Sequence, residues 1–108
     1  MSNVFKSYPV KNISTTSSTV YTVPSIIASI GVGLTIANTT SSAITTSVYI
    51  ARTGTNYYIV SGAVVPSGGS LTVAGADQKL ILQTGDSVIV SASAGNSADC
   101  WFSLLEMS

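Results

Sequence analysis

The sequence predicts an all-β domain, an antiparallel β-sandwich of jelly-roll-like type with about eight short strands. Segments in which apolar and polar residues alternate recur along the chain. Clusters of Gly, Pro, Asn, Ser and Thr separate these segments at intervals of roughly 8 to 12 residues, which is typical of sandwiches and barrels. No segment has the apolar spacing of a helix.

The segment 77–90 shows the strand pattern most clearly. Two leucines before a Thr-Gly-Asp turn and two valines after it fall on one side of an alternating pattern. Gly85 supplies the positive φ of a tight turn, and Asp86 is expected to accept hydrogen bonds from the turn backbone. We therefore predict a hairpin with one buried face.

The remaining strands are bounded by turn residues in the same way. In 30–37 every even-numbered residue is Ile, Val or Leu, and every odd-numbered residue is small, so we expect one apolar face and one small face. The small face would permit close packing by another sheet or subunit; alternatively, Gly31 and Gly33 mark a bulge. Other strands are expected at 19–24, 44–52, 57–60, 71–73 and 100–105.

Residues 1–18 are predicted to form an amino-terminal arm, followed by a sandwich domain over 19–108. Pro9 and the scattered apolar residues around it do not fit a helix. The segment is either an extended arm that docks Phe5 and Tyr8 on a neighbouring molecule or a first edge strand of the sandwich.

The composition indicates a surface that other subunits cover. Only 7% of residues are charged, four basic against four acidic, where about 25% is usual. In their place are 19 Ser and 13 Thr, and the mean hydropathy is +0.49. A neutral surface lacks the repulsion that keeps proteins apart. The alternative is a neutral, hydroxyl-rich monomer.

The composition also argues against several kinds of chemistry. The chain has no histidine, the commonest general base and metal ligand. The single cysteine, Cys100, is followed by the apolar residues Trp101 and Phe102 and is expected to be a buried structural thiol in a protein assembled in a reducing cytoplasm. No loop concentrates Asp77, Asp86 and Asp99 as a calcium site would require. We therefore expect no enzymatic activity, no cofactor and no bound metal.

Neither nucleic acid nor a membrane is an expected partner. The net charge is zero, so there is no basic surface for phosphates. No secretory signal pattern is visible, and the apolar stretch 26–37 is too short and too polar to span a bilayer.

Three aromatic residues are candidates for glycan binding, because sugar faces stack on aromatic rings. These are Tyr57, Tyr58 and Trp101. The alternative is cross-strand packing or subunit contact. Adjacent residues of a strand face opposite sides, so we expect one of the two tyrosines to lie in the core.

Several stretches of the chain resemble small virion structural proteins of tailed bacteriophages, particularly cyanophages and related aquatic phages. The similarity covers residues 19–106 and includes the turn phrases Pro66-Ser-Gly-Gly-Ser70 and Gln83-Thr-Gly-Asp86. The runs that carry it are TVYTVPS, GLTIANTTSSAITTSVYI, VVPSGGSLTV and DQKLILQTGDSVIVSAS. The resemblance implies a β-sandwich that forms homotrimers on the virion, and it implies no catalytic residues.

Together these observations predict a trimeric capsid cement or decoration protein. It would be made in the host cytoplasm and would bind the major capsid protein of the assembled shell. Contacts with the capsid or a neighbouring subunit are expected at Phe5, Tyr8, Lys11, Tyr57 and Trp101. The alternative is a neck, tail or fibre protein with a receptor-binding or glycan-binding role.

Overall fold

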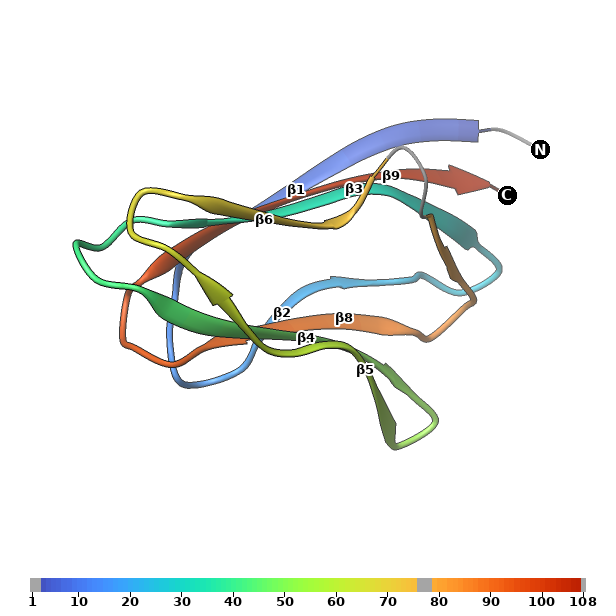
Figure 1. Ribbon diagram of the computed structural model, residues 1–108. Helices are drawn as coiled ribbons and strands as arrows, with labels where there is room; N and C mark the ends of the chain where they lie inside the picture. The colour runs from blue at the N-terminus through green and yellow to red at the C-terminus, as the bar shows by residue number, and fades with distance from the viewer. Residues whose placement is uncertain (1–2, 76–78, 108) are drawn as a thin grey trace.

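A computed structural model describes residues 3–75 and 79–107, and these residues form nine β-strands arranged as two stacked sheets (Figure 1). The molecule measures 46 × 28 × 22 Å. The strands are β1 (Asn3–Ile13), β2 (Ser18–Thr22), β3 (Ala28–Asn38), β4 (Ile44–Arg52), β5 (Thr55–Val65), β6 (Ser70–Ala74), β7 (Leu80–Leu82), β8 (Ser87–Ala92) and β9 (Ala98–Met107). The described residues contain no helix long and apolar enough to cross a membrane.

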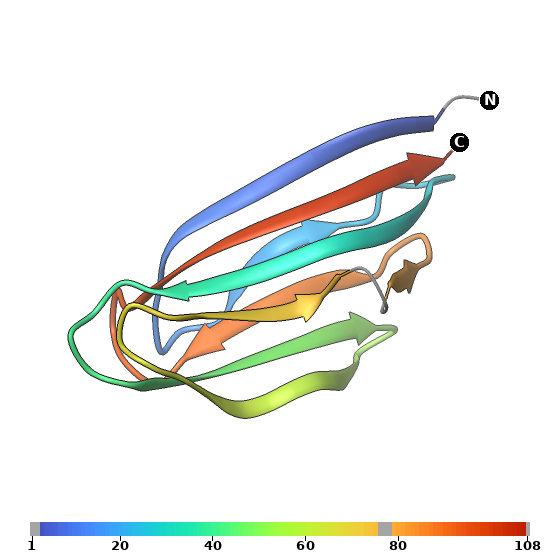
Figure 2. The same ribbon diagram turned by 45° about the horizontal axis from the view of Figure 1, so that its top comes forward.

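The strand order is that of a jelly roll. One sheet, called here the β1 sheet, has the order β1-β9-β3-β6, with β7 also paired to β3; the other, the β2 sheet, has the order β2-β8-β4-β5. Figure 2 shows β1, β9 and β3 side by side, with β6 beyond them. The chain stays within one sheet only from β4 to β5 and from β6 to β7. The predicted all-β sandwich is confirmed.

The core lies between the two sheets and follows from the alternation of side chains along each strand. In β9, residues from Ala98 to Glu106 are alternately buried and exposed or half-buried, and β4 and β8 alternate in the same way. Among the largest side chains that are fully buried are Phe102, Ile13, Leu34 and Ile36. Burying one such side chain contributes about 1.5 to 3 kcal/mol.

A bulge in β3 changes which side chains of that strand face the core. The pairing register with β9 shifts between Gly31 and Gly33, so Ile30 lies on the outer face while Leu34 is buried. The expectation that the even-numbered residues share one face is wrong, because the extra residue reverses the alternation. Gly31 faces inward, and a Cβ atom there would lie 2.8 Å from the ring of Phe102.

The segment 77–90 is a corner between sheets and not the predicted hairpin. β7 pairs with β3 in one sheet, whereas β8 pairs with β2 and β4 in the other. Alternation is the same in both arrangements, so the pattern alone did not separate them. The local predictions are confirmed, since Gly85 has a φ of 90° and the Asp86 carboxylate accepts a hydrogen bond from the Gln83 N–H at 2.8 Å. Asp77 lies outside the described residues.

The amino-terminal segment is an edge strand, one of the two alternatives that the sequence left open. β1 pairs with β9 from Asn3 to Val10 and again at Ile13, and Ile13 is fully buried in the core. The division of the chain into an arm over 1–18 and a domain over 19–108 stays a prediction.

Candidate interaction surface

The outer face of the β1 sheet carries a row of apolar side chains that crosses four strands. Register pairs Phe5 with Leu105, Leu105 with Ile30, and Ile30 with Ile81. Phe5 is 76% exposed and Ile81 is 67% exposed. Large apolar side chains scattered singly over a surface are ordinary, whereas a contiguous row is typical of an interaction site.

A second ridge, formed by Trp101, runs parallel to the row of apolar side chains, which is the first ridge. Trp101 lies between Pro9 and Thr35 in the register, and it is 54% exposed. Between the two ridges is a row of small residues, in which Ser103 pairs with Ser7 on one side and with Gly33 on the other. We call these three rows, from Phe5 to Trp101, the aromatic face.

Hollows lie on both sides of the Trp101 ridge. The first, of about 400 Å³, lies between the ridges and is lined by Phe5, Lys6, Ser7, Trp101, Ser103 and Leu104. The second, of about 330 Å³, is lined by Pro9, Val10, Lys11, Thr35, Ala37, Asp99, Cys100 and Trp101. An indole standing between two hollows is a shape that a partner surface can interlock with.

A single ion pair lies at the end of the aromatic face beyond Trp101. Lys11 Nζ is 3.3 Å from Asp99 Oδ2, and Asp99 Oδ1 accepts a hydrogen bond from the Asn12 N–H at 3.0 Å. That backbone bond, followed by Lys11, holds the pKa of Asp99 below its usual range. The two charges neutralise each other, so they leave the adjoining apolar rows without a net charge.

The outer face of the β2 sheet has a different chemistry. Its central strands present hydroxyl groups, with Ser91 on β8 paired to Ser47 on β4. On the edge strand β2, Thr22 Oγ1 lies 2.9 Å from Ser87 Oγ.

The aromatic contact of the β2 sheet's outer face is a tilted pair formed by Tyr49 and Tyr58, with ring centroids 4.9 Å apart. Ile89 and Tyr49 adjoin Tyr58 in the register of this sheet, but both are half-buried and only Tyr58 of the three is exposed. The aromatic face, which exposes Phe5, Ile81 and Trp101, is therefore the better candidate for a surface that a partner covers.

The structure brings together three of the five predicted contact residues. Phe5 and Trp101 belong to the aromatic face, and Lys11 lies at its end. Tyr8 instead packs against Tyr21, with centroids 5.0 Å apart, so it fills space between the sheets. Tyr57 is on β5 at the opposite edge of the sandwich from β1.

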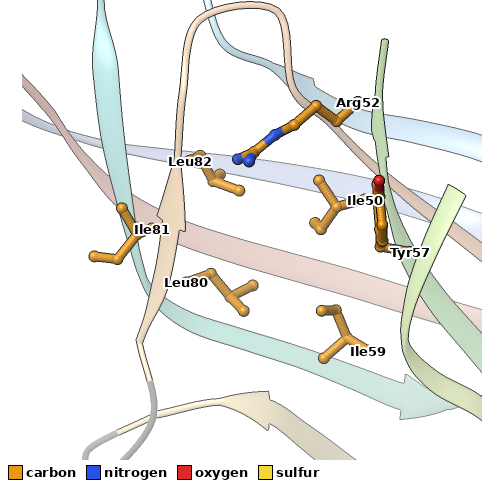
Figure 3. Close-up of a pocket in the computed structure, with 7 residues that line it drawn as sticks. All are labelled: Ile50, Arg52, Tyr57, Ile59, Leu80, Ile81 and Leu82. Carbon is orange, nitrogen blue, oxygen red and sulfur yellow. The ribbon is translucent and has the colours of Figure 1, made fainter. Parts of the chain in front are cut away.

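Both tyrosines of β5 are exposed, so the expectation that one would lie in the core is wrong. Tyr57 is 56% exposed and Tyr58 is 57% exposed. β5 is an edge strand, and the pairing register with β4 shifts beside Val48. Tyr58 packs on Tyr49 outside the sheet, whereas Tyr57 lines a hollow at the open edge between the sheets (Figure 3).

The edge hollow has apolar walls and a polar rim. It has a volume of about 380 Å³ and is lined by Ile50, Arg52, Tyr57, Ile59, Leu80, Ile81 and Leu82. Arg52 donates to Asp86 through Nε at 2.7 Å and through Nη2 at 2.6 Å. This pairing holds the pKa of Asp86 below its usual range. Asp86 is 1% exposed, so its carboxylate is not available to a ligand in the hollow.

A buried polar cluster joins the two sheets. Tyr21 on β2 donates its hydroxyl to Glu106 Oε2 on β9 at 2.6 Å, and the Ser29 hydroxyl lies 2.7 Å from the same tyrosine oxygen. Lys6 Nζ is 2.9 Å from Glu106 Oε1. The Tyr21 bond, followed by Lys6, holds the pKa of Glu106 below its usual range. Burial raises the pKa of Tyr21, so the cluster is a structural tie between groups that satisfy one another.

Cys100 is buried, as the sequence predicts. Its side chain is 3% exposed, and burial raises the pKa of the thiol to about 12. A thiol with this pKa is protonated at neutral pH and is a poor nucleophile. Among the described residues, no three His, Cys, Asp or Glu side chains are placed to hold a metal ion.

Comparisons with known proteins identify the fold but not a family. No family model matches the chain, and no curated protein matches it. A solved structure of Bacillus endospore appendages, described as disulfide-linked pili, has a TM-score of 0.52 at 18% identity, over 96% of this chain and 85% of that one. A structure of infectious bursal disease virus, Gx strain, has a TM-score of 0.38 at 11% identity, and the match spans 29% of that chain. The appendage subunit shares the sandwich fold.

Proposed function

We propose that this chain is a virion structural protein of a tailed bacteriophage, a capsid decoration protein that forms homotrimers. It would be made in the host cytoplasm and bind the major capsid protein, with no enzymatic activity. The observation that carries the proposal is the aromatic face. A monomer in water would expose Phe5, Ile81 and Trp101 together, and such contiguous apolar surface is typical of proteins that assemble.

The rest of the molecule suits a protein that packs beside many copies. With 7% charged residues and a net charge of zero, neighbouring copies do not repel one another. Hydroxyl groups bind water and so keep the surface that stays exposed hydrated. A decoration protein that binds only the assembled shell stabilises that shell by mass action, and a contact of about 800 Å² per partner is enough for a specific interface.

The proposal is tested by counting copies on purified particles. Quantitative mass spectrometry against a labelled standard gives the number of copies per virion, and hundreds of copies are expected, because only the capsid lattice repeats a site that often. A few copies, or a few tens, would place the protein at the neck or tail. Absence from particles would refute the proposal.

Point variants test binding to the shell better than a truncation does. Deleting residues 1–13 would remove β1, uncover the edge of β9 and take Ile13 from the core. Phe5→Ser changes an exposed side chain and preserves the strand. If β1 contacts the shell or a neighbouring copy, this variant should show lower occupancy on particles stripped of the native protein, whereas Val64→Ser, at 66% exposure on β5, should bind as the native chain does.

A neck, tail or fibre protein that binds glycans is the second candidate. It is favoured by the exposure of both Tyr57 and Tyr58, since exposed rings can stack on sugars. Saturable binding on a glycan array that is lost in Tyr57→Ser or Tyr58→Ser would support this function. A decoration protein should show no saturable sugar binding.

A further inference from the structure

We infer that copies of this chain meet through the aromatic face, arranged about a three-fold axis that runs along the face. The inference rests on the homotrimer in the proposed function and names the surface that forms it. Its occupant is therefore a second and a third copy of the same chain, each presenting Phe5, Trp101 and the small row between them.

The β1 sheet that carries the aromatic face is large enough for such contacts. Its outer face spans β1, β9, β3 and the β6 and β7 edge, and strands lie about 4.8 Å apart and rise about 3.3 Å per residue. The aromatic face, from Leu105 to Trp101, therefore covers about 13 Å along β9, and the whole outer face of the sheet is roughly 19 Å by 30 Å, or about 570 Å² in projection. Side-chain relief makes the accessible area larger than the projection, so each copy can bury roughly the 800 Å² of a standard interface, divided between its two neighbours.

The width of the sheet also fits three copies around one axis. Four strands span about 14 Å from the axis of the first strand to that of the last. If the edge strands of neighbouring copies lie about 4.8 Å apart at each corner, three such sheets form a triangular prism with sides of about 24 Å, and each sheet lies about 7 Å from the axis. Large exposed side chains of the outer face, among them Phe5 and Trp101, would point into that space.

The relief and charge of the face favour the same chain as the partner. Trp101 stands between hollows of about 400 and 330 Å³, so the tryptophan ridge of one copy can enter a hollow of the next. Lys11 is paired with Asp99, and Lys6, which lines the first hollow, is paired with Glu106 within each copy, so identical faces meet without uncompensated charge. The hydroxyl groups around Ser91 and Ser47 then face outward to water.

The test places one charge in the centre of the face. Ser103→Lys changes a half-buried serine on β9, a central strand of the β1 sheet. Its matched control, Ser91→Lys, changes a half-buried serine on β8, a central strand of the β2 sheet. Sedimentation velocity over a range of concentrations gives the association state, with circular dichroism to confirm that each variant is folded.

The native chain is expected to sediment as a trimer, with about three times the 11.0 kDa mass of the chain. Ser103→Lys should raise the dissociation concentration about 100-fold or more, since a charge buried without a partner is costly. Ser91→Lys should change the dissociation concentration less than about twofold, because Ser91 lies outside the proposed contact and the new charge stays in water. A second pair of variants repeats the comparison by shortening a side chain. Trp101→Ser should dissociate the trimer, and Tyr58→Ser, at a similar 57% exposure, should not.

Each contrary result has a distinct meaning. A native chain that is monomeric at every concentration, or that forms another oligomer, overturns the three-fold arrangement. A trimer that persists in both Ser103→Lys and Trp101→Ser overturns the aromatic face as the contact while leaving the trimer in place. The copy number on particles is independent of both results, so failure of the virion role is recognised separately.

Discussion

Tyr21→Phe is the substitution that most sharply tests how the two sheets are held together. It removes one oxygen atom and leaves a ring that packs between Tyr8 and Phe102, with centroid distances of 5.0 and 5.9 Å. The hydroxyl lost is the donor to Glu106 and the partner of Ser29. Glu106 is 6% exposed and Ser29 is fully buried, so water does not readily replace the missing atom.

The expected loss of stability is about 2 to 4 kcal/mol. A hydrogen bond to a charged group contributes about 1.5 to 3 kcal/mol, and a buried hydroxyl left without a partner costs about 1 kcal/mol or more. Each kcal/mol corresponds to a fall of roughly 4 to 8 °C in the melting temperature of a domain near this size. The matched control is Tyr49→Phe, because the Tyr49 hydroxyl donates to Ser17 at an exposed site, at 3.2 Å.

Urea unfolding at one protein concentration, at pH 7 and in acid, measures both the loss of stability in Tyr21→Phe and its dependence on pH. Tyr21 holds the folded-state pKa of Glu106 down; hence this stabilisation is complete above the unfolded glutamate pKa of about 4.3. It is lost as the pH falls through the folded-state pKa. The difference between the native chain and Tyr21→Phe should therefore narrow in acid. A loss no larger than that of Tyr49→Phe, or one independent of pH, would refute the proposed tie.

Two further predictions concern the core. Gly31→Ala should destabilise the domain by about 1 to 3 kcal/mol in urea unfolding, because the new Cβ would meet the Phe102 ring at 2.8 Å. Gly95→Ala, whose Cβ would meet no heavy atom within 4 Å, should be nearly neutral. An equal loss of stability in the two variants would contradict the close packing of Gly31 on Phe102. Cys100, with a pKa raised to about 12 by burial, should react with a thiol reagent only as fast as the protein opens. Rapid labelling of the folded chain would show that the thiol is accessible.

Local features of this fold could be predicted from the sequence because they depend on neighbouring residues. Alternation located the strands, and the Thr-Gly-Asp phrase identified the turn at Gly85. The partner of each strand could not be found in this way. The corner between β7 and β8 has the same alternation of apolar and polar residues as a hairpin. The bulge between Gly31 and Gly33 adds one residue, so the even-numbered side chains of β3 before and after it lie on opposite faces, contrary to what strict alternation predicts.

The candidate surface shows the same division. The aromatic residues Phe5 and Trp101 were recognised singly, but their common face depends on the pairing of β1 with β9. The polar contacts between distant residues had no signal in the sequence, since Tyr21 and Glu106 are 85 residues apart, and Arg52 and Asp86 are 34 apart. Which of these residues meet is decided by the order of the strands in the sheets. The composition showed only that the chain has few charged residues.

The fluorescence of Trp101 is the measurement that tests assembly through the aromatic face most directly. It is the only tryptophan of the chain, and it is 54% exposed when the chain is alone. Dilution through the dissociation concentration should shift its emission from the blue, buried range to the red, and should raise its quenching by acrylamide in step with the loss of trimer. Emission that stays red and fully quenchable while the protein sediments as a trimer would contradict the account.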